Sequence, residues 1–220
     1  MKIRWDGRTN AELWAWSWRY IMAVIVIGGQ SRQIGKTSVV AGIIAALPQY
    51  GWSAFKITQH RHELEPSGDL SSNGRPWEIS EEMERSGRAG QTDTGRFLAA
   101  GAEHAFWVRT EPGQLKHAMP MVQSKLAEAR NAIVESNSVM QFLQPDLYMV
   151  VIDPAIADFK ASAQEFLYRA DAVIVHGGRD NARTESIKDP AASPERTTFL
   201  ITPPHYVTQE IIDFVKKKVR

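Results

Sequence analysis

Apolar residues along this chain form short continuous runs that alternate with segments of helical spacing. Runs rich in β-branched and aromatic residues, which are typical of strands, lie at 23–27, 52–58, 104–109, 132–135, 147–153, 172–176 and 197–202. Apolar residues three and four positions apart predict helices that follow residue 36 and that span 94–100, 115–130, 162–169 and 207–219. Strands separated by helices predict an α/β fold of three layers, with a mainly parallel sheet and helices on both faces.

One long segment, residues 59–92, lacks this periodicity and is filled with Gly, Ser, Pro, Arg and Glu. Connections of this length in a compact domain are usually functional. We therefore predict a mobile insertion that orders over a bound ligand and brings His60 and Arg61 towards it. The alternative is an inert surface loop. A second polar segment, at 177–196, is also expected to be a mobile loop.

The first 21 residues differ in composition from the rest of the chain. They hold four of its seven tryptophans, and basic residues there precede an apolar run. Arg19 interrupts that run, which ends in the first predicted strand, so it is neither a removable signal peptide nor long enough to span a membrane. A Trp-rich helix on a membrane surface is one interpretation. We favour the other, an extension at 1–21 ahead of a domain that begins at Met22 and runs to residue 220.

Composition narrows the function classes. A chain of 220 residues with 43% hydrophobic and 23% charged residues fits one α/β domain with an insertion. The net charge of +1 gives no electrostatic case for nucleic acid or an anionic membrane as a partner. The absence of cysteine excludes disulfides, thiolate zinc sites and a cysteine nucleophile, and it is compatible with the cytoplasmic location that we expect.

The candidate chemistry begins between the first strand and the first helix, where residues 28–38 read GGQSRQIGKTS. Gly35, Lys36 and Thr37 match the end of the G-x-x-x-x-G-K-[ST] motif in its usual strand–loop–helix context. Loop N–H groups and the helix N-terminus attract a polyphosphate. We predict that Lys36 reaches the outer phosphates, that the Thr37 hydroxyl binds Mg²⁺, and that the triphosphate is held by Gly29, Gln30, Ser31, Arg32, Gln33, Ile34, Gly35, Lys36, Thr37 and Ser38.

One position departs from the motif, because Gln30 stands where its first glycine is required. Two explanations are open. The tight turn begins earlier, at Gly28 or Gly29, or Gln30 itself adopts a strained backbone conformation.

Three acidic residues are candidates for the carboxylate that holds Mg²⁺ or its water. In parallel sheets ligands bind at the carboxyl ends of the strands. Glu135 ends one predicted strand and Asp153 ends another, while Asp93 lies just before a predicted helix. We favour Glu135. Asp153 precedes Pro154 and is the alternative ligand, or it caps the following helix.

Several of these elements together resemble a known family. They are GGQSRQIGKTS, the strand end FKITQHRH, Asp93-Thr94-Gly95-Arg96, Ala100-Gly101-Ala102 and the strand-end Glu135. Over residues 22–140 the chain resembles the MobB-type GTP-binding proteins of molybdopterin-guanine dinucleotide biosynthesis, which are P-loop NTPases. The resemblance implies that Lys36 and Thr37 bind phosphate and Mg²⁺. It also implies that Asp93 and Glu135 are catalytic acidic groups at the metal or the attacking water, and that the partner is an enzyme of cofactor biosynthesis.

The wider class that the chain resembles includes dethiobiotin synthetase and the MinD-like ATPases. A MinD-like protein has a second lysine one residue after the first P-loop position, where this chain has Ser31. The lysine-dependent dimer mechanism is therefore not supported. Whether the chain forms a homodimer in another way is an open question.

Three functions follow from these observations. The leading one is binding and slow hydrolysis of a nucleoside triphosphate, as a GTPase or ATPase that assists assembly of a molybdopterin-type cofactor. The second is a small-molecule kinase or ATP-dependent ligase of the dethiobiotin synthetase type, and the third is a nucleotide-dependent binding switch. The chain contains no N-K-x-D guanine motif, so the choice between ATP and GTP is open.

Overall fold

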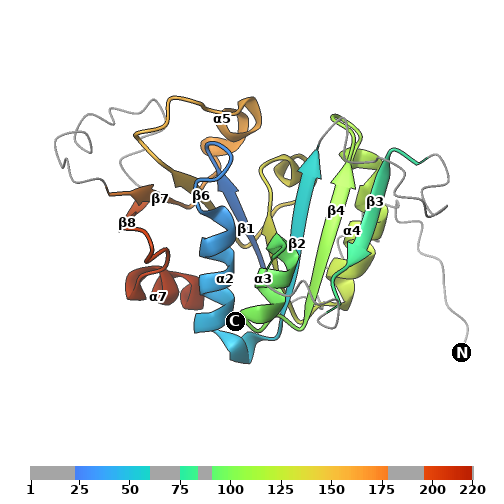
Figure 1. The fold of residues 1–220 in the computed structure, drawn as a ribbon, viewed down its shortest axis with the longest axis horizontal. Helices are drawn as coiled ribbons and strands as arrows, with labels where there is room; N and C mark the ends of the chain where they lie inside the picture. The colour runs from blue at the N-terminus through green and yellow to red at the C-terminus, as the bar shows by residue number, and fades with distance from the viewer. Residues whose placement is uncertain (1–22, 60–74, 84–90, 178–195, 220) are drawn as a thin grey trace, which may run out of the picture.

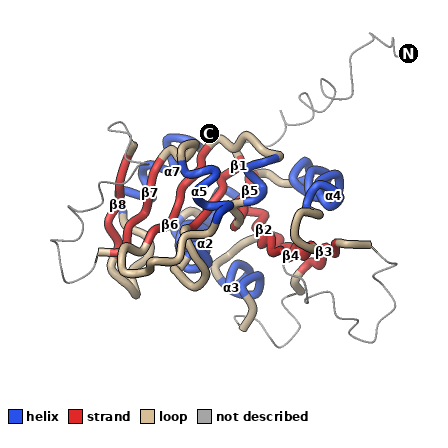
Figure 2. Tube along the Cα trace, turned by 90° about the horizontal axis from the view of Figure 1, so that it is seen from above, coloured by secondary structure: helices blue, strands red, loops and turns tan. Residues whose placement is uncertain are grey.

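The computed structural model describes residues 23–59, 75–83, 91–177 and 196–219, which form a single eight-stranded sheet between helices. The strand order is β3-β4-β2-β5-β1-β6-β7-β8, and the strands lie in one continuous row (Figures 1 and 2). Their bounds are β1 Val24–Gly29, β2 Trp52–Gln59, β3 Trp77–Glu81, β4 His104–Thr110, β5 Asn131–Glu135, β6 Leu147–Ile152, β7 Ala172–His176 and β8 Thr197–Ile201. Every pairing is parallel except that of β3 with β4.

Helices cover both faces of the sheet. One face packs against α2 (Lys36–Ala46), α3 (Asp93–Ala99) and α7 (Gln209–Lys218). The other packs against α4 (Leu115–Glu128), α5 (Ala161–Leu167) and the 3₁₀ turn η4 (Ser138–Gln141). Strand β1 shows why both faces need a cover. Its Ile25 and Ile27 point into the core beneath α2, α3 and α7, while Val24 and Val26 point into the core beneath α4, α5 and η4. A strand buried on both faces has no polar alternation.

The predicted fold class is confirmed: an α/β protein of three layers with a mainly parallel sheet. All seven predicted strands and all five predicted helices are present, with ends that differ by a few residues. No helix in the described ranges is long and apolar enough to cross a membrane.

Strand β3 was not predicted. It lies inside the segment 59–92, for which we expected no regular structure, and pairs antiparallel with β4 at the edge of the sheet. Its side chains are only half-buried, so its sequence lacks the apolar run that marks the other strands. Residues 60–74 and 84–90, the extension 1–21 and residues 178–195 lie outside the described residues. The predicted mobility of the segments 59–92 and 177–196, the movement of His60 and Arg61 towards a ligand, and the proposed domain start at Met22 stay predictions.

The sheet order decides which loops lie together. Strand β1 sits between β5 and β6, so the connection that follows β1 opens at the point where the chain turns from one half of the sheet to the other. In α/β sheets a ligand crevice forms at such a point. The register brings Glu135 next to Ile27 of β1 on one side and next to Lys56 of β2 on the other.

Candidate functional site

The loop between β1 and α2 has the conformation that a phosphate-binding loop requires at its end. Gly35 precedes α2 with φ 84°, and Gln33 has φ 56°, so the chain passes twice through the left-handed region. A Cβ atom at position 35 would overlap the ring of Tyr206, which lies against the glycine. Glycine is thus required at position 35 by both the backbone and its neighbour.

Gln30, which replaces the first glycine of the motif, attaches the loop to the segment after β6. Its side-chain Nε2 donates to Ile156 O (2.6 Å) and its Oε1 accepts from Asp153 N (2.9 Å). Its backbone is not among the positive-φ positions of the described residues, which decides against the strained-backbone explanation. At the position where the motif has glycine, this chain therefore has a buried side chain that forms hydrogen bonds with two backbone groups.

A second support for the loop comes from Asn137, which sequence reasoning did not single out. Its amide accepts from Gly29 N (2.8 Å) and donates to Gly29 O (2.9 Å). The Asn137 Oδ1 and the Tyr148 ring also lie so close to Gly28 that a Cβ there would overlap them. Glycine is needed at position 28 for this close approach, and a Cβ at position 29 would overlap the side chains of Lys36 and Ile34. The residue after these two glycines is Gln30, where the motif has its first glycine.

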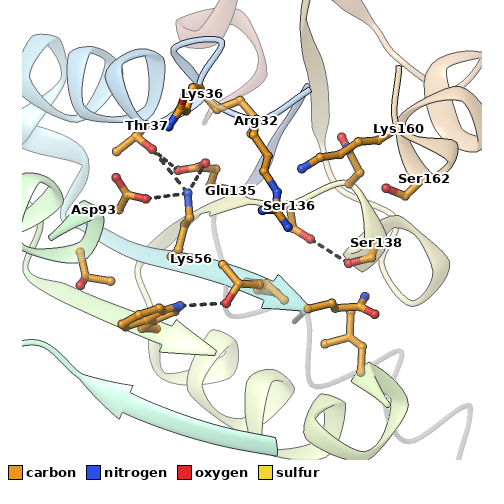
Figure 3. A pocket seen from close by; sticks show the side chains of 18 of the residues that line it. Arg32, Lys36, Thr37, Lys56, Asp93, Glu135, Ser136, Ser138, Lys160 and Ser162 are labelled. Carbon is orange, nitrogen blue, oxygen red and sulfur yellow. Dashed lines mark hydrogen bonds and ion pairs between the residues drawn. The ribbon is translucent and has the colours of Figure 1, made fainter. Parts of the chain in front are cut away.

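At the start of α2, four side chains from four elements meet. Thr37 Oγ1 donates to Glu135 Oε2 over 2.8 Å, and Glu135 is 2% exposed. Lys56, within β2, forms ion pairs with Glu135 Oε1 and with Asp93 Oδ2, the latter at 2.8 Å. Its Nζ also lies 3.5 Å from Thr37 Oγ1. Figure 3 shows Lys56 pointing between Asp93 and Glu135, beneath Thr37.

Lys56 keeps its charge in this setting. Burial lowers its pKa, but the nearby Glu135 and the hydrogen bonds to Asp93 and Glu135 outweigh that effect, so the pKa lies above the usual value for lysine.

Lys36 differs from Lys56 in its partners. Its Nζ donates to the Ser31 backbone carbonyl, and its aliphatic stem packs so close to Gly29 that a Cβ there would lie 2.6 Å from Lys36 Cδ. Burial lowers the pKa of Lys36 to about 8, because the attraction of Glu135 does not compensate for it and Lys160 and Lys56 add repulsion. In the ligand-free protein this lysine therefore loses its charge at mildly alkaline pH.

This pKa predicts how anion binding depends on pH. A polyphosphate contacting Lys36 favours the charged form, so above pH 8 binding must be accompanied by proton uptake. We expect the Kd for a nucleoside triphosphate to rise by up to about tenfold per pH unit above that value. Calorimetric titrations from pH 7 to 9 in buffers of different ionisation enthalpy measure both quantities. Lys36→Arg should remove the dependence, and a Kd that is constant over this range in the parent would contradict the prediction.

These groups line a cavity of about 890 Å³ at the carboxyl ends of the central strands. Of the predicted site residues, those along its wall are Arg32, Gln33, Gly35, Lys36, Thr37, Ser38, Asp93 and Glu135. The other predicted loop residues, Gly29, Gln30, Ser31 and Ile34, are not part of the wall. They are buried and support the loop from behind.

Asp153, the alternative carboxylate, lies apart from these groups. It does not line the cavity. Its Oδ1 accepts from Ala155 N (2.9 Å), and its Oδ2 lies 3.5 Å from His176 Nδ1. The first contact closes a turn directly after β6, whereas the next helix, α5, begins only at Ala161, so Asp153 does not cap that helix.

The opposite side of the cavity carries further groups that sequence reasoning missed. Lys160 and Ser162, at the start of α5, line it together with Ser136 and Ser138 (Figure 3). Burial and then the charge of Arg32 lower the pKa of Lys160. Trp107 of β4 also lines the cavity, and its indole Nε1 donates to Thr58 Oγ1 (3.0 Å). No local motif marks these residues, since the folded chain brings them together from different strand ends.

The donor set at Thr37, Glu135 and Asp93 fits Mg²⁺. All three offer oxygen atoms, which hard cations prefer, and an ammonium group already lies among them, so their geometry accepts a cation. No group of three or more His, Cys, Asp or Glu residues that could hold a metal exists in the described part of the chain. Mg²⁺ at a nucleotide needs only one or two carboxylates beside phosphate oxygens and water.

Solved structures with a similar fold include two HypB proteins. HypB from Helicobacter pylori in complex with nickel is 15% identical, with a TM-score of 0.56, and the match covers 94% of this chain and 92% of that one. The hydrogenase maturation factor HypB from Archaeoglobus fulgidus is 13% identical, with a TM-score of 0.57, over 96% and 97% of the two chains. No protein family matches the sequence, and no curated protein is similar to it. At these identities the likeness shows the fold, an α/β protein of three layers with a mainly parallel sheet.

Proposed function

We propose that this chain binds a nucleoside triphosphate together with Mg²⁺ and hydrolyses it slowly. The observation that carries the proposal is the 2.8 Å contact between Thr37 Oγ1, at the start of α2, and the buried Glu135 Oε2 at the end of β5. A hydroxyl at the start of the loop helix and a carboxylate at a neighbouring strand end are the protein ligands by which P-loop proteins hold Mg²⁺.

The remaining groups have roles that follow from their positions. Lys36 and the N-terminus of α2 present positive charge to the cavity. This charge favours binding of the outer phosphates there. Bound Mg²⁺ would neutralise phosphate charge at Thr37 and Glu135. Glu135 and Asp93 are the carboxylates that can orient an attacking water. Catalysis of this kind depends mainly on positioning and electrostatics.

We further propose a MobB-like role, in which nucleotide turnover assists a partner enzyme in assembling a molybdopterin-type cofactor. Support comes from the D-T-x-R element, which the structure places beside the loop. Asp93 contacts Lys56, and Arg96 Nη2 donates to Ser38 Oγ (2.9 Å). The similar structure from Archaeoglobus fulgidus is named a hydrogenase maturation factor, so an assembly role has a precedent in this fold.

A second candidate is phosphoryl transfer to a small acceptor. Beyond the loop and the carboxylates, the cavity wall extends to Lys160, Ser162, Trp107 and Phe142. An acceptor with an acidic group would find a cation there. This extension favours a kinase or ligase reaction over a simple switch.

Calorimetric titration with ATP and GTP, each with Mg²⁺ and with EDTA, tests the proposal. We expect one of the two to bind at least about tenfold more tightly with Mg²⁺, followed by slow release of phosphate. Failure of both to bind would overturn it. A strong acceleration by a small acidic acceptor would favour the second candidate instead.

A further inference from the structure

Lys56 occupies the position that the three predicted metal ligands define. Its Nζ lies 2.8 Å from Asp93 Oδ2 and 3.5 Å from Thr37 Oγ1, and it forms an ion pair with Glu135 Oε1. These oxygens belong to the three residues that the sequence predicted as ligands of Mg²⁺. An ammonium group and a divalent cation cannot both stand at the centre of the same oxygens.

The need for a cation at this point follows from the burial of Glu135. Its side chain is 2% exposed, and an isolated carboxylate in such a place is strongly disfavoured. Thr37 donates one hydrogen bond to Oε2, but a hydroxyl does not neutralise a charge. Lys56 supplies the positive charge, and its own side chain is 15% exposed.

The backbone holds this lysine in place while leaving its side chain free to change direction. Lys56 and Glu135 are register partners on the neighbouring strands β2 and β5, so their Cα atoms keep a constant separation. The four-carbon stem of lysine carries a charge that can swing between positions. The adjoining cavity offers it space, since Lys56 lines the same wall as Lys36 and Thr37.

We propose that Lys56 is a tethered cation that neutralises Glu135 and Asp93 in the nucleotide-free protein and that yields its position to Mg²⁺ when a nucleoside triphosphate binds. The inference rests on the proposed function for its second half. The ammonium that is released then faces the cavity, where the outermost phosphate supplies a new negative partner. Lys56 thereby makes metal binding depend on the nucleotide, because Mg²⁺ alone gains too little from two carboxylates to displace it.

The test is Mg²⁺ binding without nucleotide, measured by thermal unfolding in MgCl₂ and in NaCl of equal ionic strength. We expect no specific effect of Mg²⁺ on the wild-type Tm. In Lys56→Met the two carboxylates lack their cation, and about 10 mM Mg²⁺ should raise the Tm by roughly 3–6 °C for a site with a Kd near ~1 mM. Equal responses of the two proteins would overturn the inference.

Two variants act as controls. Lys160→Met removes another lysine from the same cavity wall, but one for which the structure shows no ion pair with Glu135 or Asp93, and it should show no response to Mg²⁺. Lys56→Met combined with Glu135→Gln removes both the cation and the buried charge, so it should fold and lose the response. A response that survives in this double variant would place the metal elsewhere and contradict the inference.

A measurement on the wild-type protein covers the case in which Lys56→Met does not fold. The ε-methylene signal of Lys56 in ¹³C-lysine NMR, assigned with Lys56→Arg, should move on addition of Mg²⁺ with triphosphate and stay in place with triphosphate and EDTA. An unchanged signal in a protein that binds the Mg²⁺–triphosphate would refute the displacement. Absence of any nucleotide binding would instead refute the proposed function, while the nucleotide-free Mg²⁺ response still decides whether Lys56 holds the cation position.

Discussion

Replacing Lys36 with Ala should weaken binding of a nucleoside triphosphate by about 2–4 kcal/mol, or roughly 30- to 900-fold in Kd. The reason is the location of the side chain. Lys36 lines the cavity and its Nζ donates to the Ser31 carbonyl behind the wall, and burial makes its positive charge costly unless an anion is present. A triphosphate provides that anion, and alanine leaves its outer phosphates without the charge. Fluorescence titration with a labelled nucleotide measures the change.

The matched control is Lys125→Ala, because Lys125 lies on α4 outside the cavity wall, where it is half-buried and contacts Glu128 and the Phe106 ring. Lys125→Ala lowers the net charge of the protein by the same amount as Lys36→Ala. It should leave the Kd for the triphosphate within about twofold of the wild-type value. Thermal unfolding shows whether Lys36→Ala still folds, since its stem packs on Gly29. Undiminished triphosphate affinity in a folded Lys36→Ala protein would refute the phosphate-binding assignment of the loop.

Glu135→Gln should retain nucleotide binding and reduce hydrolysis by a factor of about 10²–10⁴. The amide has the same shape as the carboxylate, so the packing at the end of β5 is preserved. It has no charge to attract Mg²⁺ or to orient water, and its NH₂ group faces either the Thr37 hydroxyl or Lys56, both of which are donors. Release of phosphate under saturating Mg²⁺ and nucleotide gives the rate, and thermal unfolding reports any loss of stability.

Asp153→Asn distinguishes the two candidate carboxylates. Asp153 lies outside the cavity wall and contacts Ala155 and His176, so its variant should hydrolyse nucleotide at close to the parental rate. Should Glu135→Gln keep full turnover while Asp153→Asn loses it, Asp153 would be the carboxylate that matters. In that case Glu135 serves only to pair with Lys56.

The candidate site could be predicted in part because its central motif is local. Gly35, Lys36 and Thr37 are consecutive, and their strand–loop–helix context can be read within one short stretch of sequence. The expectation that ligands bind at strand ends then selected Glu135, whose carboxylate accepts a hydrogen bond from Thr37 in the structure. The roles of these residues in binding and hydrolysis stay predictions. Gln30 could not be interpreted from the sequence, since its two backbone partners are more than a hundred residues away.

The layers of the fold follow from the hydrophobic pattern of the chain. Apolar runs with no polar alternation require strands buried on both faces, and the helices between them make the sheet parallel. Strand β3 shows the limit of such patterns, because a half-buried edge strand is defined by its pairing with β4 rather than by its own residues.

The residues that surround the loop could not be predicted from the sequence, because they come from distant parts of the chain. Asn137 holds Gly29 across 108 positions of sequence, and Lys56 meets Glu135 across 79. Such contacts arise from the order and register of parallel strands, which place distant strand ends side by side. The pattern of a single strand carries no record of its neighbour in the sheet. The presence of a lysine among the predicted metal ligands was therefore beyond the reach of sequence reasoning.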